Sequence, residues 1–550
     1  MSDSHYDVVV VGGGINGCGV ARDLAMRGLR VALVERRDLG SGTSGHSSGM
    51  IHGGPRYLAT EMEVTRASCA DAGHIRAIAP GLVFRVPFLI PFFKGTPRLA
   101  AEALEAYFEA YDAYQPLKGG HRHTRLSAEE ARRIEPGLSP DVAGAISFDE
   151  WGIDGFRLCL LNALDARRHG ADLFTYSPVV GLLRDGSRVS GVVAKTAVGE
   201  RRLSANVVVN VAGVWAPQLA ALGGVSARVR PGKGVHLVYA RRLGNYGIMT
   251  RAIDGRWIFV EPHQNGALVG TTDDDFYGDP DRMRATQDEV RYLLEGIARV
   301  LPTILEHRFV RTMAGLRPTL HAYGTAPDKL SRDHAILDHE SDGAPGLITM
   351  IGGKLAYYRA MCEELADRVM RGVGSGGPCR THIEPLPGGD APADADRLVE
   401  RFRVPPPAAS RLCYRHGSLS AAVLERGGEE GGGVLCPCEP VLVAEARHAV
   451  RDELATSIDD LRRRTRLGEG PCQGTICIGR AAALLFEEGA VSIEQAHRQV
   501  MASLLERARG QEAALDQADG APGGPPLAAE ELQRCKYLLV GDYRRLPWSS

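Results

Sequence analysis

The sequence predicts an α/β fold built on a dinucleotide-binding unit, and three features of its first 35 residues support this prediction. Residues 8–11 are four consecutive valines, a run typical of a buried strand. Residues 12–17, GGGING, match G-x-G-x-x-G, and apolar residues follow them at helical spacing. A second apolar run, residues 31–34, ends at Glu35. This succession favours a dinucleotide site over a glycine-rich turn in an unrelated α/β protein.

Each part of this unit has a role in binding a dinucleotide. Glycines let the backbone turn tightly and approach a pyrophosphate, which lies at the positive end of the following helix. Glu35 follows the glycines at the spacing expected for a carboxylate that binds a ribose hydroxyl.

Length and composition limit the remaining possibilities. The chain has 550 residues, enough for about two or three domains, and a formal net charge of −2, which gives no sign of nucleic-acid binding. No run of 18 apolar residues predicts a membrane span, and the polar first residues lead directly into a strand, so no signal peptide is expected. In a chain that we therefore expect to be cytoplasmic, eleven cysteines favour metal-binding spacing over a disulfide framework.

A long segment rich in glycine, serine and threonine follows the second strand, at residues 36–58. Small hydroxyl side chains and accessible amides suit contact with a phosphate chain or a flat ring, and the alternative is a disordered surface loop.

A family resemblance appears at this point. GGGING at 12–17, SGTS at 41–44 and IHGGPRYL at 51–58 resemble FAD-dependent glycerol-3-phosphate dehydrogenases, which belong to a larger group of flavoproteins that includes glycine and D-amino-acid oxidases. The resemblance implies FAD as the cofactor, in a Rossmann-like FAD-binding domain with an inserted antiparallel-sheet substrate domain. A buried strand that ends at residues 212–213, and a strand that ends at residues 352–354, resemble two further FAD contacts. The residues expected to bind FAD are Gly12, Gly13, Gly14, Asn16, Gly17, Glu35, Thr43, Ser44, Ser48, His52, Gly53, Ala212, Gly213, Gly352, Gly353 and Lys354.

The substrate residues also follow from the resemblance. It places His236 in the active site, although a histidine at this position of a strand could equally be a satisfied sheet residue. Two arginines on predicted loops, Arg317 and Arg332, suit a phosphate because a guanidinium offers planar paired donors, and ordinary surface arginines are the alternative. His236 and Lys354 are the candidates for the base or polarising group, with Arg56 near the reacting end. Asp154 is predicted to cap the helix that follows it.

Four cysteines near the C-terminus form C-x-C…C-x4-C, at Cys436, Cys438, Cys472 and Cys477. Such a set can close a four-sulfur site for zinc or for a [2Fe–2S] cluster, or remain as free thiols. The segment resembles the ferredoxin-associated small domains and, more closely, the C-terminal part of anaerobic-type glycerol-3-phosphate dehydrogenase catalytic subunits. This resemblance favours the iron–sulfur cluster, with zinc as the alternative.

The expected organisation has four parts. Residues 1–375 form the FAD-dependent oxidoreductase, 376–433 a connecting segment and linker, 434–485 the small helical four-cysteine domain, and 486–550 a helical or disordered tail.

The resemblance implies oxidation of sn-glycerol 3-phosphate to dihydroxyacetone phosphate, with hydride transfer from C2 to flavin N5. Electrons would leave through the iron–sulfur centre to partner subunits and a membrane quinone pool, with the protein peripheral on the inner face of the membrane. Three alternatives remain open: an amine oxidase of the same fold acting on glycine, sarcosine or a D-amino acid, a dehydrogenase of another 2-hydroxy acid, and an electron-transfer subunit without turnover.

Overall fold

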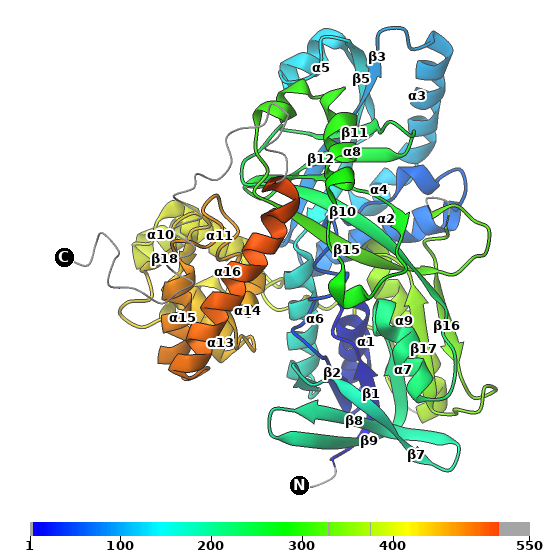
Figure 1. Cartoon of the computed structure of the whole chain (residues 1–550), viewed down its shortest axis with the longest axis vertical. Coiled ribbons are helices and arrows are strands. Elements are labelled where there is room, and N and C mark those ends of the chain that lie inside the picture. Colours follow the sequence, from blue (N-terminus) through cyan, green and yellow to red (C-terminus); the bar gives the residue numbers. More distant parts are fainter. Residues whose placement is uncertain (1–3, 328–329, 375, 516–550) are drawn as a thin grey trace.

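The computed structural model describes residues 4–327, 330–374 and 376–515 as two large sheets with their helices and a helical C-terminal body (Figure 1). The first sheet has eight strands and holds the predicted βαβ unit. Strand β1 (Ser4–Val11) lies at its centre, parallel to both β2 (Val31–Val34) and β9 (Gly199–Asn210). The valines of β1 are buried because α1 (Ile15–Met26) packs over one face and a second apolar cluster covers the other. The remaining strands are β6 (Asp172–Phe174), β7 (Val179–Asp185), β8 (Arg188–Thr196), β16 (His334–Asp338) and β17 (Leu347–Gly352).

Helices α6 (Gly155–Arg168) and α9 (Tyr358–Val373) lie beside α1 and complete the first layer. The predicted cap is confirmed, since the Asp154 side chain accepts hydrogen bonds from the backbone N–H groups of Phe156 and Arg157.

The second sheet is the inserted one and is antiparallel over most of its nine strands. Strand β10 (Val229–Tyr239) pairs on one side with β13 (Gly266–Gly270) and on the other with β15 (Arg311–Leu320), and β12 (Trp257–His263) pairs with β13 in a hairpin. Helix α8 (Gln287–Ala298) buries its apolar side in the same cluster as the core-facing residues of these strands. The sheet also contains β3 (Val83–Phe93), β4 (Thr124–Ser127), β5 (Val142–Ile153), β11 (Gly247–Arg251) and β14 (Asp274–Asp275), and the chain around it forms α3 (Arg98–Asp112), α4 (Gln115–Lys118) and α5 (Ala128–Ile134). Helices α2 (Met62–Ile78) and α7 (Ala216–Leu222) pack instead on the first layer, α2 against α9 and α7 against β7, β9 and β17.

The C-terminal body is helical and begins earlier than expected. Residues 376–433, expected to be a connecting segment, contain α10 (Ala395–Phe402), α11 (Pro406–His416) and α12 (Ser420–Glu425), which share an apolar core. The rest consists of β18 (Val434–Cys436), β19 (Val441–Leu442), α13 (Val443–Arg451), α14 (Ile458–Thr465), α15 (Ile478–Glu487) and α16 (Ile493–Leu515). The expected tail beyond residue 515 lies outside the described residues. Among the helices that the structure describes, none is both long and apolar enough to cross a membrane.

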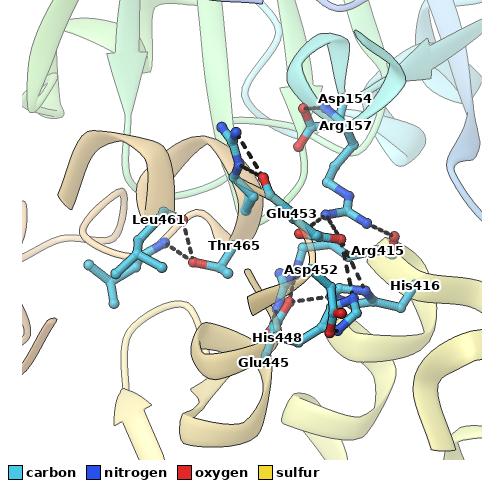
Figure 2. A network of polar contacts seen from close by, with 12 residues as sticks. Asp154, Arg157, Arg415, His416, Glu445, His448, Asp452, Glu453, Leu461 and Thr465 are labelled. Carbon is cyan, nitrogen blue, oxygen red and sulfur yellow. Dashed lines mark hydrogen bonds and ion pairs between the residues drawn. The ribbon is translucent and has the colours of Figure 1, made fainter. Parts of the chain in front are cut away.

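Buried ion pairs join the C-terminal body to the first layer (Figure 2). Arg157 on α6 donates from Nη1 to both carboxylate oxygens of Glu453, at 2.9 and 2.8 Å, and from Nη2 to the carbonyl oxygen of Arg415. Arg463 and Arg464 on α14 bind the carboxylate of Asp38, three residues after Glu35. The body that carries the four cysteines is therefore fixed directly to the predicted cofactor strand.

Candidate active site

A cavity of about 760 Å³ is lined by residues of both sheets, and it brings together most of the predicted site residues. Those on its wall are Gly12, Gly14, Asn16, Glu35, Thr43, Ser44, Ser48, His52, Ala212, Gly213, His236, Arg317, Arg332, Gly352, Gly353 and Lys354. Gly13, Gly17 and Gly53 are not part of the wall. The side chain of Arg56 is outside the part of the structure that is described.

The glycine turn leaves no room for side chains at its closest point. Gly12 has φ +118°, a conformation that favours glycine, and a Cβ on Gly17 would overlap the carbonyl oxygen of Gly12. The backbone N–H of Gly13 donates to Glu35 Oε2 at 2.6 Å, and that of Arg37 donates to Oε1 at 2.7 Å. Burial raises the pKa of Glu35, although these donors oppose the shift. The turn thus positions a carboxyl group at the cavity wall, as a ribose site requires.

The loop after β2 packs tightly, contrary to the alternative of a disordered surface loop. Ser44 Oγ accepts a hydrogen bond from the first backbone N–H of α1, that of Ile15, at 2.9 Å. Thr43 Oγ1 donates to the carbonyl oxygen of Leu316 at 2.6 Å, and a Cβ on Gly45 would overlap the ring of Phe156. Small residues are therefore needed here because the loop lies between α1, α6 and β15.

His236 is only half satisfied, which distinguishes it from an ordinary sheet histidine. Its Nε2 lies 3.0 Å from Ser48 Oγ, whereas its buried Nδ1 has no hydrogen-bond partner among the described residues. Burial, with a smaller contribution from the charge of Arg317, lowers the pKa of His236 to about 3. The imidazole is therefore neutral near pH 7 and can accept a proton or share a hydrogen bond with a ligand.

The two predicted arginines meet at the cavity wall. Arg317 lies within strand β15 and not on a loop, because its segment pairs with β10, where it stands opposite Gly232. Arg332 lies two residues before β16, and its buried Nε has no hydrogen-bond partner in the described part of the chain. The carboxylate of Asp273 binds both guanidinium groups.

Lys354 reaches the cavity from the end of β17. Gly352 and Gly353 both have positive φ, and a Cβ on either would meet backbone or packed side chains. The ammonium group of Lys354 lies 4.9 Å from the centre of the Tyr57 ring. This turn leads through a short 3-10 helix (Leu355–Tyr357) into α9, and the backbone N–H of Gly353 donates to the carbonyl oxygen of Asp333 at 2.8 Å.

Sequence reasoning missed two acidic residues of this site. Glu261 lines the cavity with 1% of its surface exposed, and neither of its oxygens has a hydrogen-bond partner among the residues described. Burial raises its pKa well above 4.5, which favours the neutral acid. Its signal was a single glutamate in an otherwise apolar strand, residues 258–262. Asp273 gave no local signal of its pairing with the two arginines.

The four cysteines converge as two pairs. The sulfur atoms of Cys438 and Cys472 are 3.7 Å apart, and the thiols of Cys436 and Cys477 interact with each other. The hydrogen bond with Cys477 lowers the pKa of Cys436 to about 6.

Comparisons with known proteins show which family the chain resembles. The family model "FAD dependent oxidoreductase" matches residues 7–359, and "C-terminal domain of alpha-glycerophosphate oxidase" matches residues 379–495. One relative is the Escherichia coli (strain K12) protein named as a subunit of anaerobic glycerol-3-phosphate dehydrogenase. The two chains are 36% identical over 516 residues, which cover 92% of each. The corresponding protein of Haloferax volcanii is 34% identical, over 88% of this chain and 83% of that protein.

A solved structure has the same overall fold. The glycerol-3-phosphate dehydrogenase of Bacillus halodurans, complexed with FAD, superposes with a TM-score of 0.74 at 25% identity, covering 93% of this chain and 96% of that one. Glycine oxidase of Geobacillus kaustophilus shares the fold over 67% of this chain and 95% of its own, with a TM-score of 0.51 at 24% identity. The prediction of an α/β FAD-binding fold with an inserted antiparallel sheet is thus confirmed, and the chain belongs to the FAD-dependent oxidoreductases, in the glycerol-3-phosphate dehydrogenase family.

Proposed function

We propose that this protein holds FAD in the cavity and oxidises the C2 hydroxyl of sn-glycerol 3-phosphate, which yields dihydroxyacetone phosphate. The observation that carries this proposal is the pair of guanidinium groups, Arg317 and Arg332, on the wall of the cavity that also contains the glycine turn. A phosphate monoester has the charge and oxygen geometry that paired guanidinium groups bind. The relatives named as glycerol-3-phosphate dehydrogenases support the same substrate.

We assign each residue a role from its position around the cavity. Bound FAD supplies the chemistry of hydride acceptance at the flavin ring. Arg317 and Arg332 hold the phosphate and thereby fix the carbon that is oxidised. His236, neutral near pH 7, is the first candidate to accept the hydroxyl proton, and Lys354 is the second. We place Arg56 near the end of the substrate that is oxidised.

Anaerobic titration of the FAD-loaded protein tests the substrate. Glycerol 3-phosphate is expected to bleach the oxidised flavin absorbance, whereas glycine, sarcosine and D-amino acids leave it unchanged. Bleaching by amino acids would favour an amine oxidase, and bleaching by other 2-hydroxy acids a different dehydrogenase. Failure of all these compounds to bleach the flavin would favour an electron-transfer protein without turnover.

We also propose a [2Fe–2S] cluster at Cys436, Cys438, Cys472 and Cys477. A single tetrahedral zinc with sulfur ligands at about 2.3 Å needs all four sulfurs about 3.8 Å apart. The described cysteines approach one another as two pairs, Cys438 with Cys472 and Cys436 with Cys477, an arrangement that suits two metal atoms, each bound by two thiolates. Zinc remains the alternative.

Metal analysis decides between the two. The purified protein is expected to contain iron and acid-labile sulfide in equal amounts and to give an EPR signal after dithionite reduction. Cys472→Ser should lose the iron, whereas Cys413→Ser, at a partly buried thiol of α11 outside the set, should keep it. Zinc without iron in the wild-type protein would contradict the cluster.

The route beyond this centre is part of the same proposal. Electrons pass to partner subunits and on to a membrane quinone pool, and the protein is held at the inner face of the membrane through those partners. The Escherichia coli relative is named as one subunit of its enzyme, which supports an assembly with other subunits. Quinone reduction that depends on added membrane subunits would support this route.

A further inference from the structure

Asp273 lies between the two arginines of the proposed phosphate site. Its Oδ1 is 3.2 Å from Arg317 Nη1, and its Oδ2 is 2.5 Å from Arg332 Nη2. The carboxyl group is buried, with 8% of the residue exposed, so solvent screens these contacts little. One carboxylate therefore bridges two guanidinium groups that come from different segments of the chain.

The bridge belongs to a built cluster. Arg317 also donates from Nη1 to the carbonyl oxygen of Thr272 at 3.2 Å and from Nη2 to Thr271 Oγ1 at 3.0 Å. Its guanidinium lies against Gly234 of β10, where a Cβ would be 2.6 Å from Nη2 and 2.8 Å from Nη1. The glycine thus makes the space in which the guanidinium rests.

Arg332 is held from the other side. Its carbonyl oxygen accepts a hydrogen bond from the Tyr357 hydroxyl at 2.8 Å, and its Nη2 binds Asp273. Its Nε is buried, makes no hydrogen bond with any described residue, and belongs to a side chain on the cavity wall. A donor therefore remains for a ligand after the bridge has formed.

Charge explains why a bridge is needed. Two guanidinium groups close together repel each other, and each long side chain loses rotamer freedom when it is ordered. A carboxylate between them offsets the repulsion and orders both before a ligand arrives, so less free energy of binding is spent on organising the site. Two arginines and one carboxylate leave a net charge of +1 for an anion.

We propose that Asp273 is the positioning residue that sets Arg317 and Arg332 at the separation needed for the oxygens of a phosphate monoester. This inference rests on the proposed function. A planar carboxylate ligand is satisfied by one guanidinium fork, whereas a phosphate can use two held at a fixed separation. Asp273 thereby makes the site selective for phosphate esters over carboxylic acids.

The test is Asp273→Asn in the FAD-loaded protein, with binding of inorganic phosphate and of glycerol 3-phosphate measured by anaerobic calorimetric titration. The dissociation constants for both are expected to rise about tenfold or more, because one ordered charged contact is worth about that factor. The limiting rate of flavin bleaching at saturating substrate should change much less. If Asp273 served only in folding, its substitution would not weaken binding while leaving the limiting rate of bleaching nearly unchanged.

Asp275→Asn is the matched control. Asp275 lies two residues farther along, in β14, and makes an equally close ion pair with Arg230, at 2.6 Å, but neither residue lines the cavity. The control should bind phosphate as the wild type does. Gly234→Ala is a second variant, expected to weaken phosphate binding similarly because its Cβ displaces Arg317 while Asp273 remains in place.

The outcomes separate this inference from the proposed function. If Asp273→Asn binds phosphate as tightly as the wild type or more tightly, the carboxylate only competes with the anion, and the inference is wrong. If the wild type binds phosphate but glycerol 3-phosphate does not bleach its flavin, the proposed reaction fails while the effect of Asp273 is still measured. If the wild type binds neither ligand, both are wrong.

Discussion

Gly17→Ala is expected to give a protein that is purified without FAD. The new Cβ would overlap the carbonyl oxygen of Gly12 and lie 2.9 Å from its carbonyl carbon, and both atoms belong to backbone that cannot rotate away as a side chain can. The turn must therefore open, which moves the N-terminus of α1 and the donor that Gly13 gives to Glu35. The measurement is the ratio of FAD to polypeptide, from flavin absorbance after denaturation. We expect it to fall about fivefold or more relative to wild type, since overpacking typically costs about 1–3 kcal/mol.

Gly181→Ala is the control for this experiment. Gly181 lies in β7 of the same sheet, and its Cβ would meet Val193 at 3.8 Å, an ordinary contact. This variant should keep its FAD. A Gly17→Ala protein with wild-type FAD content would show that the turn is not the pyrophosphate site.

Glu453→Gln is expected to lower the free energy of unfolding by several times more than the surface variant Glu425→Gln described below. Glu453 and Arg157 are 2% and 1% exposed, and the substitution leaves the guanidinium of Arg157 buried without a matching charge. Breaking one partner of a buried ion pair costs about 3–5 kcal/mol. Urea unfolding followed by circular dichroism measures this change in the free energy of unfolding.

Two buried carboxylates, Glu453 and Glu445, make the free energy of unfolding of the wild-type protein depend on pH in the acid range. Burial alone would raise the pKa of Glu453, but Arg157 and then His448 and His416 outweigh it, so the pKa is held well below 4.5. Burial would also raise the pKa of Glu445, but its contacts with Arg415 and His416 have the larger effect and lower this pKa to about 2 (Figure 2). Because both folded pKa values lie below the unfolded ones, the stabilisation is present above about pH 4.5 and is lost as the pH falls from there towards 2. Glu453→Gln should show a weaker decline over this range.

Glu425→Gln controls for the loss of a carboxylate as such. Glu425 pairs with Arg401 at 2.6 Å on the surface of the same body, where the two side chains are 48% and 55% exposed. Such a pair contributes less than about 1 kcal/mol. Equal losses in both glutamine variants would contradict the role given to the buried pair.

The sequence was sufficient for features that neighbouring residues determine. The βαβ unit around Gly12 and Gly17 and the cap at Asp154 were both predicted from spacing over a few residues, and the structure confirms them. Periodicity and local hydrogen bonding decide such elements, so the pattern carries the information. The four-cysteine pattern likewise identified residues that converge in space.

Contacts between segments far apart in the sequence could not be predicted from local sequence patterns. Residues 376–433 were expected to connect two domains because glycine and proline interrupt them, yet three short helices there share one core. Arg317 was expected on a loop, but the pairing of β15 with β10 keeps it in a strand. In both cases tertiary packing outweighed the local signal.

The sequence by itself determined that the chain has a dinucleotide turn and a set of four cysteines, because each is written in a short local pattern, whereas the inserted sheet was implied by the family resemblance. Only the tertiary structure decided that Asp273 bridges two arginines, that Glu261 faces the cavity, and that Arg157 binds a carboxylate 296 residues away. These contacts form where separate segments meet, and the energy that selects them comes from burying charge and apolar surface together, which no spacing along the chain records.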